Sequence, residues 1–205
     1  MHTIRNLSAG EQTTGANSRR TQAIMAEIVH LTEYRTHAAE KKAFQPWHRR
    51  FGETYDRTSR LNNLSDGTLF FLAQPGEDRA MAYYELIMGV LGLGNAHKFF
   101  YLDNPVQVRV MDMHLLLADQ VRFEMMRRLG WLDRFSGEDY ALFDWVRHFE
   151  SLKTPCRAIP PMLSKAHEGY ERYCRLGDRE KETFIRRLLP EALTAFARRL
   201  RHDSP

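Results

Sequence analysis

Apolar residues recur along this chain at helical spacing, with polar residues between them. Two segments, residues 77–93 and 106–129, carry apolar side chains on almost every side when they are drawn as helices. The second segment contains no Gly or Pro. A helix that is apolar all round is typically buried inside a domain. We therefore expect these two helices to form the centre of the fold.

Amphipathic patterns and capping residues predict further helices. They cover residues 19–42, 46–62, 137–150, 161–176, 179–188 and 190–201, whereas residues 69–73 fit either a short helix or a short strand. Short connections between long helices indicate a bundle. The predicted fold is all-α, with seven or eight helices in a single domain over residues 19–202. The polar residues 1–18 are expected to form a flexible arm.

Composition narrows the class of protein. The 205 residues are 43% hydrophobic and 27% charged, as in ordinary soluble domains, and the net charge of +4 permits acidic partners without requiring them. Cys156 and Cys174 have neither metal-ligand spacing nor the pattern of a disulfide framework. The longest apolar run, residues 86–93, is too short to span a membrane. We expect a cytoplasmic, bacterial-type protein without a signal peptide or a membrane partner.

Ionisable residues interrupt the apolar segment 106–129. Asp112 and Asp119 fall within roughly 20° of one another on the helix, Arg109 lies beside them, and His114 points to another face. The functional interpretation is a carboxylate pair that binds a cation or exchanges protons. The structural interpretation pairs the carboxylates with arginines and gives His114 a backbone acceptor. We favour the structural interpretation because buried charges usually have such partners.

Segment 77–93 repeats this theme. Glu85, Gly89 and Gly92 share one face, where the missing side chains allow another backbone to come close. If this helix packs on 106–129, a cavity could form between them. Its candidate catalytic residues are Glu85, Asp112, His114 and Asp119, and its candidate ligand-binding residues are Tyr83, Tyr84 and Arg109. We favour close packing, with Glu85 in a salt bridge, over such a cavity.

Other motifs carry less information. Glu27 and His30 have the spacing of a metal site, but no second pair follows and their sector lies opposite an apolar stripe, so we predict no metal site there. The sequence indicates no particular cofactor. Arginine clusters at 49–50, 127–128, 186–187 and 198–201 would suit nucleic acid if they converged on one surface. Most lie in last turns of predicted helices, where cations complement the helix dipole, and this second interpretation is favoured.

The function that fits best is non-enzymatic. We expect a binding or regulatory protein that contacts another protein, a second copy of itself, or a small ligand. Phe99, Phe100 and Tyr101, between the two central helices, form the expected partner-binding segment, unless they fold onto the chain's own core. The alternatives are a metal-dependent or acid/base enzyme with a pocket between the central helices, and a nucleic-acid-binding protein.

Overall fold

The computed structural model describes residues 34–133, 140–152 and 158–203. The chain divides into two compact units, Met1–Ala38 and Ala39–Pro205. Only residues 34–38 of the first unit are described, and they are helical. The predicted arm, residues 1–18, and the predicted Glu27–His30 pair lie outside the described residues. All elements named below belong to the second unit.

Helices build the second unit. After helical residues 39–51, the elements are η1 (Leu61–Asn63), α2 (Asp66–Ala73), α3 (Glu77–Leu91), η2 (Ala96–Tyr101), α4 (Asn104–Arg128), α5 (Leu142–Ser151), α6 (Tyr170–Cys174), α7 (Asp178–Arg187) and α8 (Leu189–Asp203). Within the described ranges there is no strand, only two isolated bridges, Arg60 with Ala141 and Leu132 with Leu163. The predicted all-α fold is confirmed, with a helix count slightly above seven or eight.

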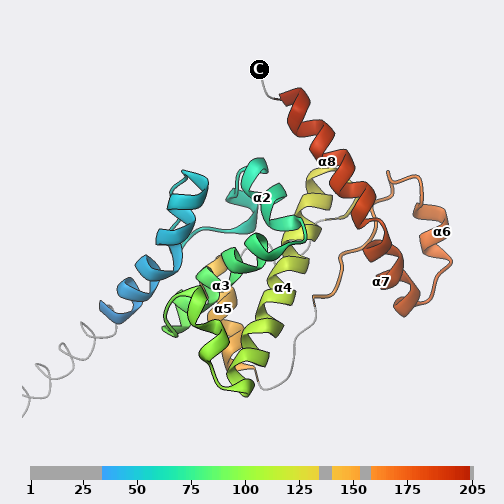
Figure 1. Ribbon diagram of the computed structural model, residues 1–205. Coiled ribbons are helices and arrows are strands. Elements are labelled where there is room, and N and C mark those ends of the chain that lie inside the picture. The colour runs from blue at the N-terminus through green and yellow to red at the C-terminus, as the bar shows by residue number, and fades with distance from the viewer. Residues whose placement is uncertain (1–33, 134–139, 153–157, 204–205) are drawn as a thin grey trace, which may run out of the picture. The chain divides into compact units, whose positions relative to one another are not determined.

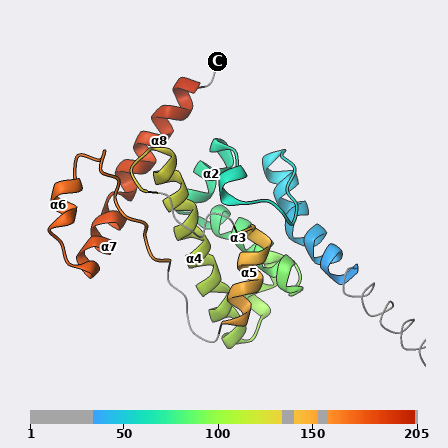
Figure 2. The ribbon, with the colours of Figure 1, turned by 180° about the vertical axis from the view of Figure 1, so that it is seen from behind.

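Helices α3 and α4 form the buried centre, as the sequence predicted. Helix α4 packs against α2, α3 and α8, and α3 also packs against α5. Figure 1 shows this arrangement, and Figure 2 shows it from behind. The large apolar side chains of the two helices that are at most 1% exposed are Leu86, Ile87, Met88, Val90, Val110, Leu117, Val121, Met125 and Met126. Each contributes about 1.5–3 kcal/mol through burial, so these two helices dominate the core.

Capping residues set the ends of α2 and α3. The Ser65 hydroxyl accepts a hydrogen bond from the Thr68 amide at 3.1 Å and so caps the start of α2. Residues 69–73, which fitted either a helix or a strand, are part of this helix. Gly92 ends α3 with φ at 70°, in the left-handed region that favours glycine. The predicted helix 77–93 therefore ends at Leu91, with Gly92 as its cap.

The predicted break at Pro46 is wrong. Residues 39–51 form one continuous helix through this proline, although a proline inside a helix costs about 3 kcal/mol. Phe44 and Trp47, at most 1% exposed, lie on either side of it, and the Trp47 indole donates to the Ala82 carbonyl at 2.8 Å. Burying two large aromatic side chains outweighs the proline penalty, because each is worth about 3 kcal/mol or more.

The predicted helix 46–62 also ends early, at residue 51. Gly52 follows with φ at 71°, and the chain then turns toward the start of α2. There the Glu53 carboxylate accepts hydrogen bonds from Ser65, from Tyr55 at 2.7 Å and from Thr68 at 3.2 Å. These bonds join the loop to α2, and they replace the helical bonds that the apolar spacing predicted.

The predicted helix 161–176 is mostly wrong. Only Tyr170–Cys174 is helical. The Ser164 amide donates to the Trp131 carbonyl at 2.8 Å, and the Asp133 amide donates to the Met162 carbonyl at 2.9 Å. These long-range backbone bonds hold residues 162–164 extended beside residues 131–133, so a helix cannot begin there.

Candidate functional site

Four predicted site residues meet where α3 packs on α4. The centre of the His114 ring lies 5.0 Å from that of Tyr83 and 5.3 Å from that of Tyr84. The Phe99 ring stacks on Tyr84 at 4.4 Å. Burial, followed by the positive charge of Arg122, lowers the pKa of His114 from 6.5 to about 4. His114 is therefore a neutral side chain packed among aromatic rings at neutral pH.

The candidate carboxylates have different surroundings. Glu85 accepts a hydrogen bond from Arg50 at 3.2 Å. Asp119 accepts hydrogen bonds from two guanidinium groups, that of Arg122 at 3.3 Å and that of Arg186 on α7 at 2.6 Å. These contacts match the structural interpretation of both residues.

Asp112 differs from the other two carboxylates. It is half-buried and has no ion-pair or hydrogen-bond partner among the residues that the structure describes. Asp112 and His114 are two positions apart on α4, which places them roughly 200° apart around the helix axis. They therefore point to nearly opposite sides, and Asp112 does not face the aromatic rings around His114.

Two candidate ligand-binding residues have structural contacts. The Arg109 guanidinium donates to three carbonyl groups at the end of α5: those of Phe149 and Leu152, and that of Glu150 at 3.1 Å. The Tyr83 hydroxyl donates to the Leu72 carbonyl at 3.0 Å. Arg109 thus satisfies carbonyls that a helix end leaves without partners, and Tyr83 links α3 to α2.

The predicted partner-binding segment is partly buried and partly exposed to solvent. Phe99 is 6% exposed and belongs to the core, whereas Phe100 is 71% exposed and Tyr101 is 89% exposed. The 3-10 helix η2 turns Phe99 inward toward Tyr84 and leaves the next two rings in solvent. Two of the three residues are thus accessible to a partner.

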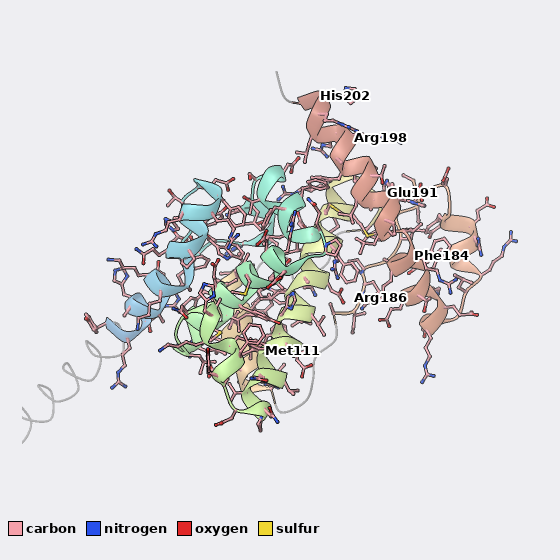
Figure 3. All side chains as sticks on the ribbon, in the orientation of Figure 1. Met111, Phe184, Arg186, Glu191, Arg198 and His202 are labelled. Atoms are coloured by element: carbon pink, nitrogen blue, oxygen red, sulfur yellow. The ribbon has the colours of Figure 1, made fainter. Side chains whose placement is uncertain are left out.

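A second accessible apolar surface lies on α4. Val108, Met111 and Leu115 are 56%, 46% and 57% exposed. Their spacing of three and then four residues aligns them on one face of the helix. We call these three residues the α4 patch, and Figure 3 labels Met111 within it. The apolar pattern of 106–129 did not reveal this patch, because nothing in that pattern separates outward from inward apolar residues.

The same face of α4 is covered further along the helix. Asp119, four residues after Leu115, binds Arg186, whose guanidinium also lies 5.8 Å from the centre of the Phe123 ring. Arg186 donates to the Ala158 carbonyl at 3.2 Å as well. Residues 158–163 run beside α4 in both Figure 1 and Figure 2. The Arg186 side chain of α7 therefore lies over the second half of the α4 face, and the α4 patch is the exposed first half.

The predicted arginine clusters take part in the fold. Arg128 binds Glu124 at 3.2 Å and also binds Asp66, which Arg199 approaches at 3.6 Å. Trp47, the aromatic side chain next to Arg49 and Arg50, is fully buried and is not available to stack on a base. Exposed arginines remain at 49, 187, 198 and 201. Nucleic-acid binding through them stays an untested prediction.

The described residues contain neither a cluster of metal-ligating side chains nor a helix that could cross a membrane. Within residues 34–133, 140–152 and 158–203, no three His, Cys, Asp or Glu side chains gather as a metal site would require. In the same ranges no helix combines the length and the apolar character needed to cross a membrane.

Comparison with protein-family models, with curated proteins and with solved structures found no match to this chain.

Proposed function

We propose that this chain is a non-enzymatic binding protein and that the α4 patch is its contact surface for another protein. The observation that carries the proposal is the exposure of Val108, Met111 and Leu115 on one face of the central helix. Single exposed apolar residues are common, but an aligned group more often marks an interaction site. Apolar anchors at helical spacing are also the usual means by which one helix binds another.

The contacts of the pocket candidates support binding over catalysis. Asp119 is bound to two arginines, and Arg109 and Tyr83 donate to backbone carbonyls. Glu85 is bound to Arg50 through one oxygen, while its other oxygen is buried without a hydrogen-bond partner among the described residues. Asp112, which also has no partner there, points away from His114. A catalytic group needs a free polar atom directed at a substrate. The enzyme alternative therefore has less support than protein binding.

Site-specific photocrosslinking tests the proposal. A photoreactive amino acid replaces Leu115 in the full chain, in cells that naturally produce the protein, and a matched variant carries it at Thr194, an exposed position on α8. We expect one discrete adduct with another protein from position 115 and none from position 194. Equal, diffuse labelling from both positions would rule out the α4 patch as a specific contact surface.

Location and self-association are further parts of the proposal. We propose a cytoplasmic protein, in keeping with its two cysteines and with the reduced thiols of that compartment. Phe100 and Tyr101 would form the contact with a second copy, since both rings are largely exposed. Sedimentation velocity of the purified chain and of a Tyr101→Ser variant tests this contact. A dimer that the variant weakens would support it, and a monomer at all concentrations would refute it.

A further inference from the structure

The exposed half of α4 carries unpaired carboxylates and no unpaired cation. The carboxylates of Asp103, directly before the helix, and of Asp112, beside the α4 patch, have no ion-pair or hydrogen-bond partner in the described part of the chain. Arg109 is the only Lys or Arg within residues 104–121, and its guanidinium is bound to the end of α5. The apolar surface thus has an acidic edge, although the whole chain has a net charge of +4.

We infer that the partner which the α4 patch fits is a cationic amphipathic helix. This inference rests on the proposed function and adds the chemistry of the partner. Apolar side chains of that helix would cover Val108, Met111 and Leu115, and one of its lysines or arginines would meet Asp112. Complementary charges at the edge of an apolar contact select the partner and orient it.

The geometry of α4 suits such a partner. From Val108 to Leu115 the helix rises about 10 Å, at about 1.5 Å per residue, so two turns of a second helix can lie along the patch. Packed helices lie about 8–10 Å apart, with the side-chain ridge of one in the groove of the other. Asp112 comes four residues after Val108 and three before Leu115, so it borders both apolar neighbours. A cation one turn from the partner's apolar ridge would reach it.

Two labelled synthetic peptides test the sign of the partner. One is an amphipathic helix of leucine and lysine, and the other replaces every lysine with glutamate. Fluorescence anisotropy measures their binding to the full chain at two salt concentrations. Because the chain is positive overall, nonspecific attraction favours the glutamate peptide. We expect the lysine peptide to bind and the glutamate peptide to bind at least about tenfold more weakly, a difference of roughly 1.4 kcal/mol.

Variants locate the binding site. Leu115→Ser should lower the affinity for the lysine peptide by about tenfold. Asp112→Asn should lower this affinity by a smaller factor and make it less dependent on salt concentration. Tyr101→Ser, at an exposed ring outside the patch, should leave it unchanged. Circular dichroism should show the same helicity for all variants, because each changed residue is exposed or half-buried.

Three outcomes would overturn the inference. If the glutamate peptide binds more tightly and Leu115→Ser abolishes that binding, the α4 patch prefers an anionic partner. The proposed function would then still stand. Self-association of the chain that Leu115→Ser abolishes would show that a second copy occupies the patch. If Leu115→Ser and Asp112→Asn bind the lysine peptide as tightly as the wild type does, the peptide does not bind at the α4 patch. Photocrosslinking at position 115 would then test the proposed function separately.

Discussion

At the scale of single residues, His114 shows how burial determines the charge of a side chain. Its ring lies against Tyr83 and Tyr84, and its pKa falls to about 4. An unfolded histidine titrates near 6.5. Between these two pH values the unfolded chain binds a proton that the folded chain does not, so the free energy of unfolding decreases as the pH falls.

The first prediction concerns this pH dependence. The stabilising contribution of neutral His114 is complete above pH 6.5 and is lost as the pH falls toward about 4. Its size is on the order of 2–3 kcal/mol. Urea unfolding between pH 7 and pH 4 should show this loss in the wild type and in His97→Gln, an exposed control on η2, and should lack it in His114→Gln. If the free energy of unfolding depends on pH in the same way for all three proteins, His114 is not the group responsible for the loss.

The second prediction concerns Gly89, where α3 crosses helical residues 39–51. A Cβ atom at Gly89 would lie 2.4 Å from the Ala43 Cα and 2.9 Å from the Lys42 carbonyl carbon, both of them backbone atoms. Gly89→Ala should therefore lower the free energy of unfolding by about 1–3 kcal/mol, through overpacking that side-chain rotation cannot relieve.

A matched control for Gly89 lies in α2. The nearest atom to a Cβ at Gly67 is the Ser65 Oγ, at 3.9 Å. Gly67→Ala should leave the chain as stable as the wild type, or make it more stable by up to about 1 kcal/mol, since alanine favours the helix. Denaturant titration compares the two variants, and equal destabilisation would show that the helix crossing at Gly89 is not as close as described.

At the scale of elements, Asp119 joins α7 to α4. Its carboxylate accepts hydrogen bonds from Arg186 and Arg122, whereas Asp112, seven residues earlier on the same helix, has no such partner among the described residues. Asp119→Ala should destabilise the chain by about 1–2 kcal/mol, because Arg122 loses its carboxylate and Arg186 keeps only that of Glu182, at 3.1 Å. Asp112→Ala should change stability by less than about 0.5 kcal/mol. Chemical denaturation of both variants checks this third prediction, and the reverse ranking would contradict it.

Helix positions could be predicted where local signals and tertiary packing agree. Gly92 and the apolar run through α4 each placed an element to within a few residues, whereas residues 69–73 could not be assigned to helix or strand. Prediction failed where distant contacts decide the conformation. Pro46 is held inside a helix by the burial of its aromatic neighbours, and residues 162–164 are extended because they bond to residues 131–133. Neither effect is visible in a local pattern.

The candidate site was less predictable than the fold. Helical spacing correctly put His114 and Asp112 on different faces of α4. It did not show that Arg186, 67 residues after Asp119, would cover one half of the outward face. Nor did it show that Val108, Met111 and Leu115 would remain exposed on the other half. A helix that is apolar all round does not reveal which of its faces lacks a neighbour.

At the scale of the whole molecule, the orientation of α4 determines which of its residues a partner can reach. One side of the helix packs into the core with α2, α3 and α8. On the outward side, the Arg186 side chain of α7 binds Asp119 in the second half, and Val108, Met111 and Leu115 in the first half are exposed. We propose that this exposed half binds another protein. The oxidation of methionines on and near α4 reports directly on whether a partner covers it. Met111 is 46% exposed and Met162 is 60% exposed, whereas Met113 is 2% exposed.

Peroxide oxidation of these methionines, followed by mass spectrometry, tests the claim with the purified chain and within intact cells that naturally produce it. In the purified chain, Met111 should oxidise at a rate close to that of Met162 and much faster than Met113. In cells, Met111 should become protected relative to Met162, because the partner covers it. Equal rates for Met111 in both settings would contradict the binding surface, and faster oxidation of Met113 than of Met111 would contradict the orientation of α4.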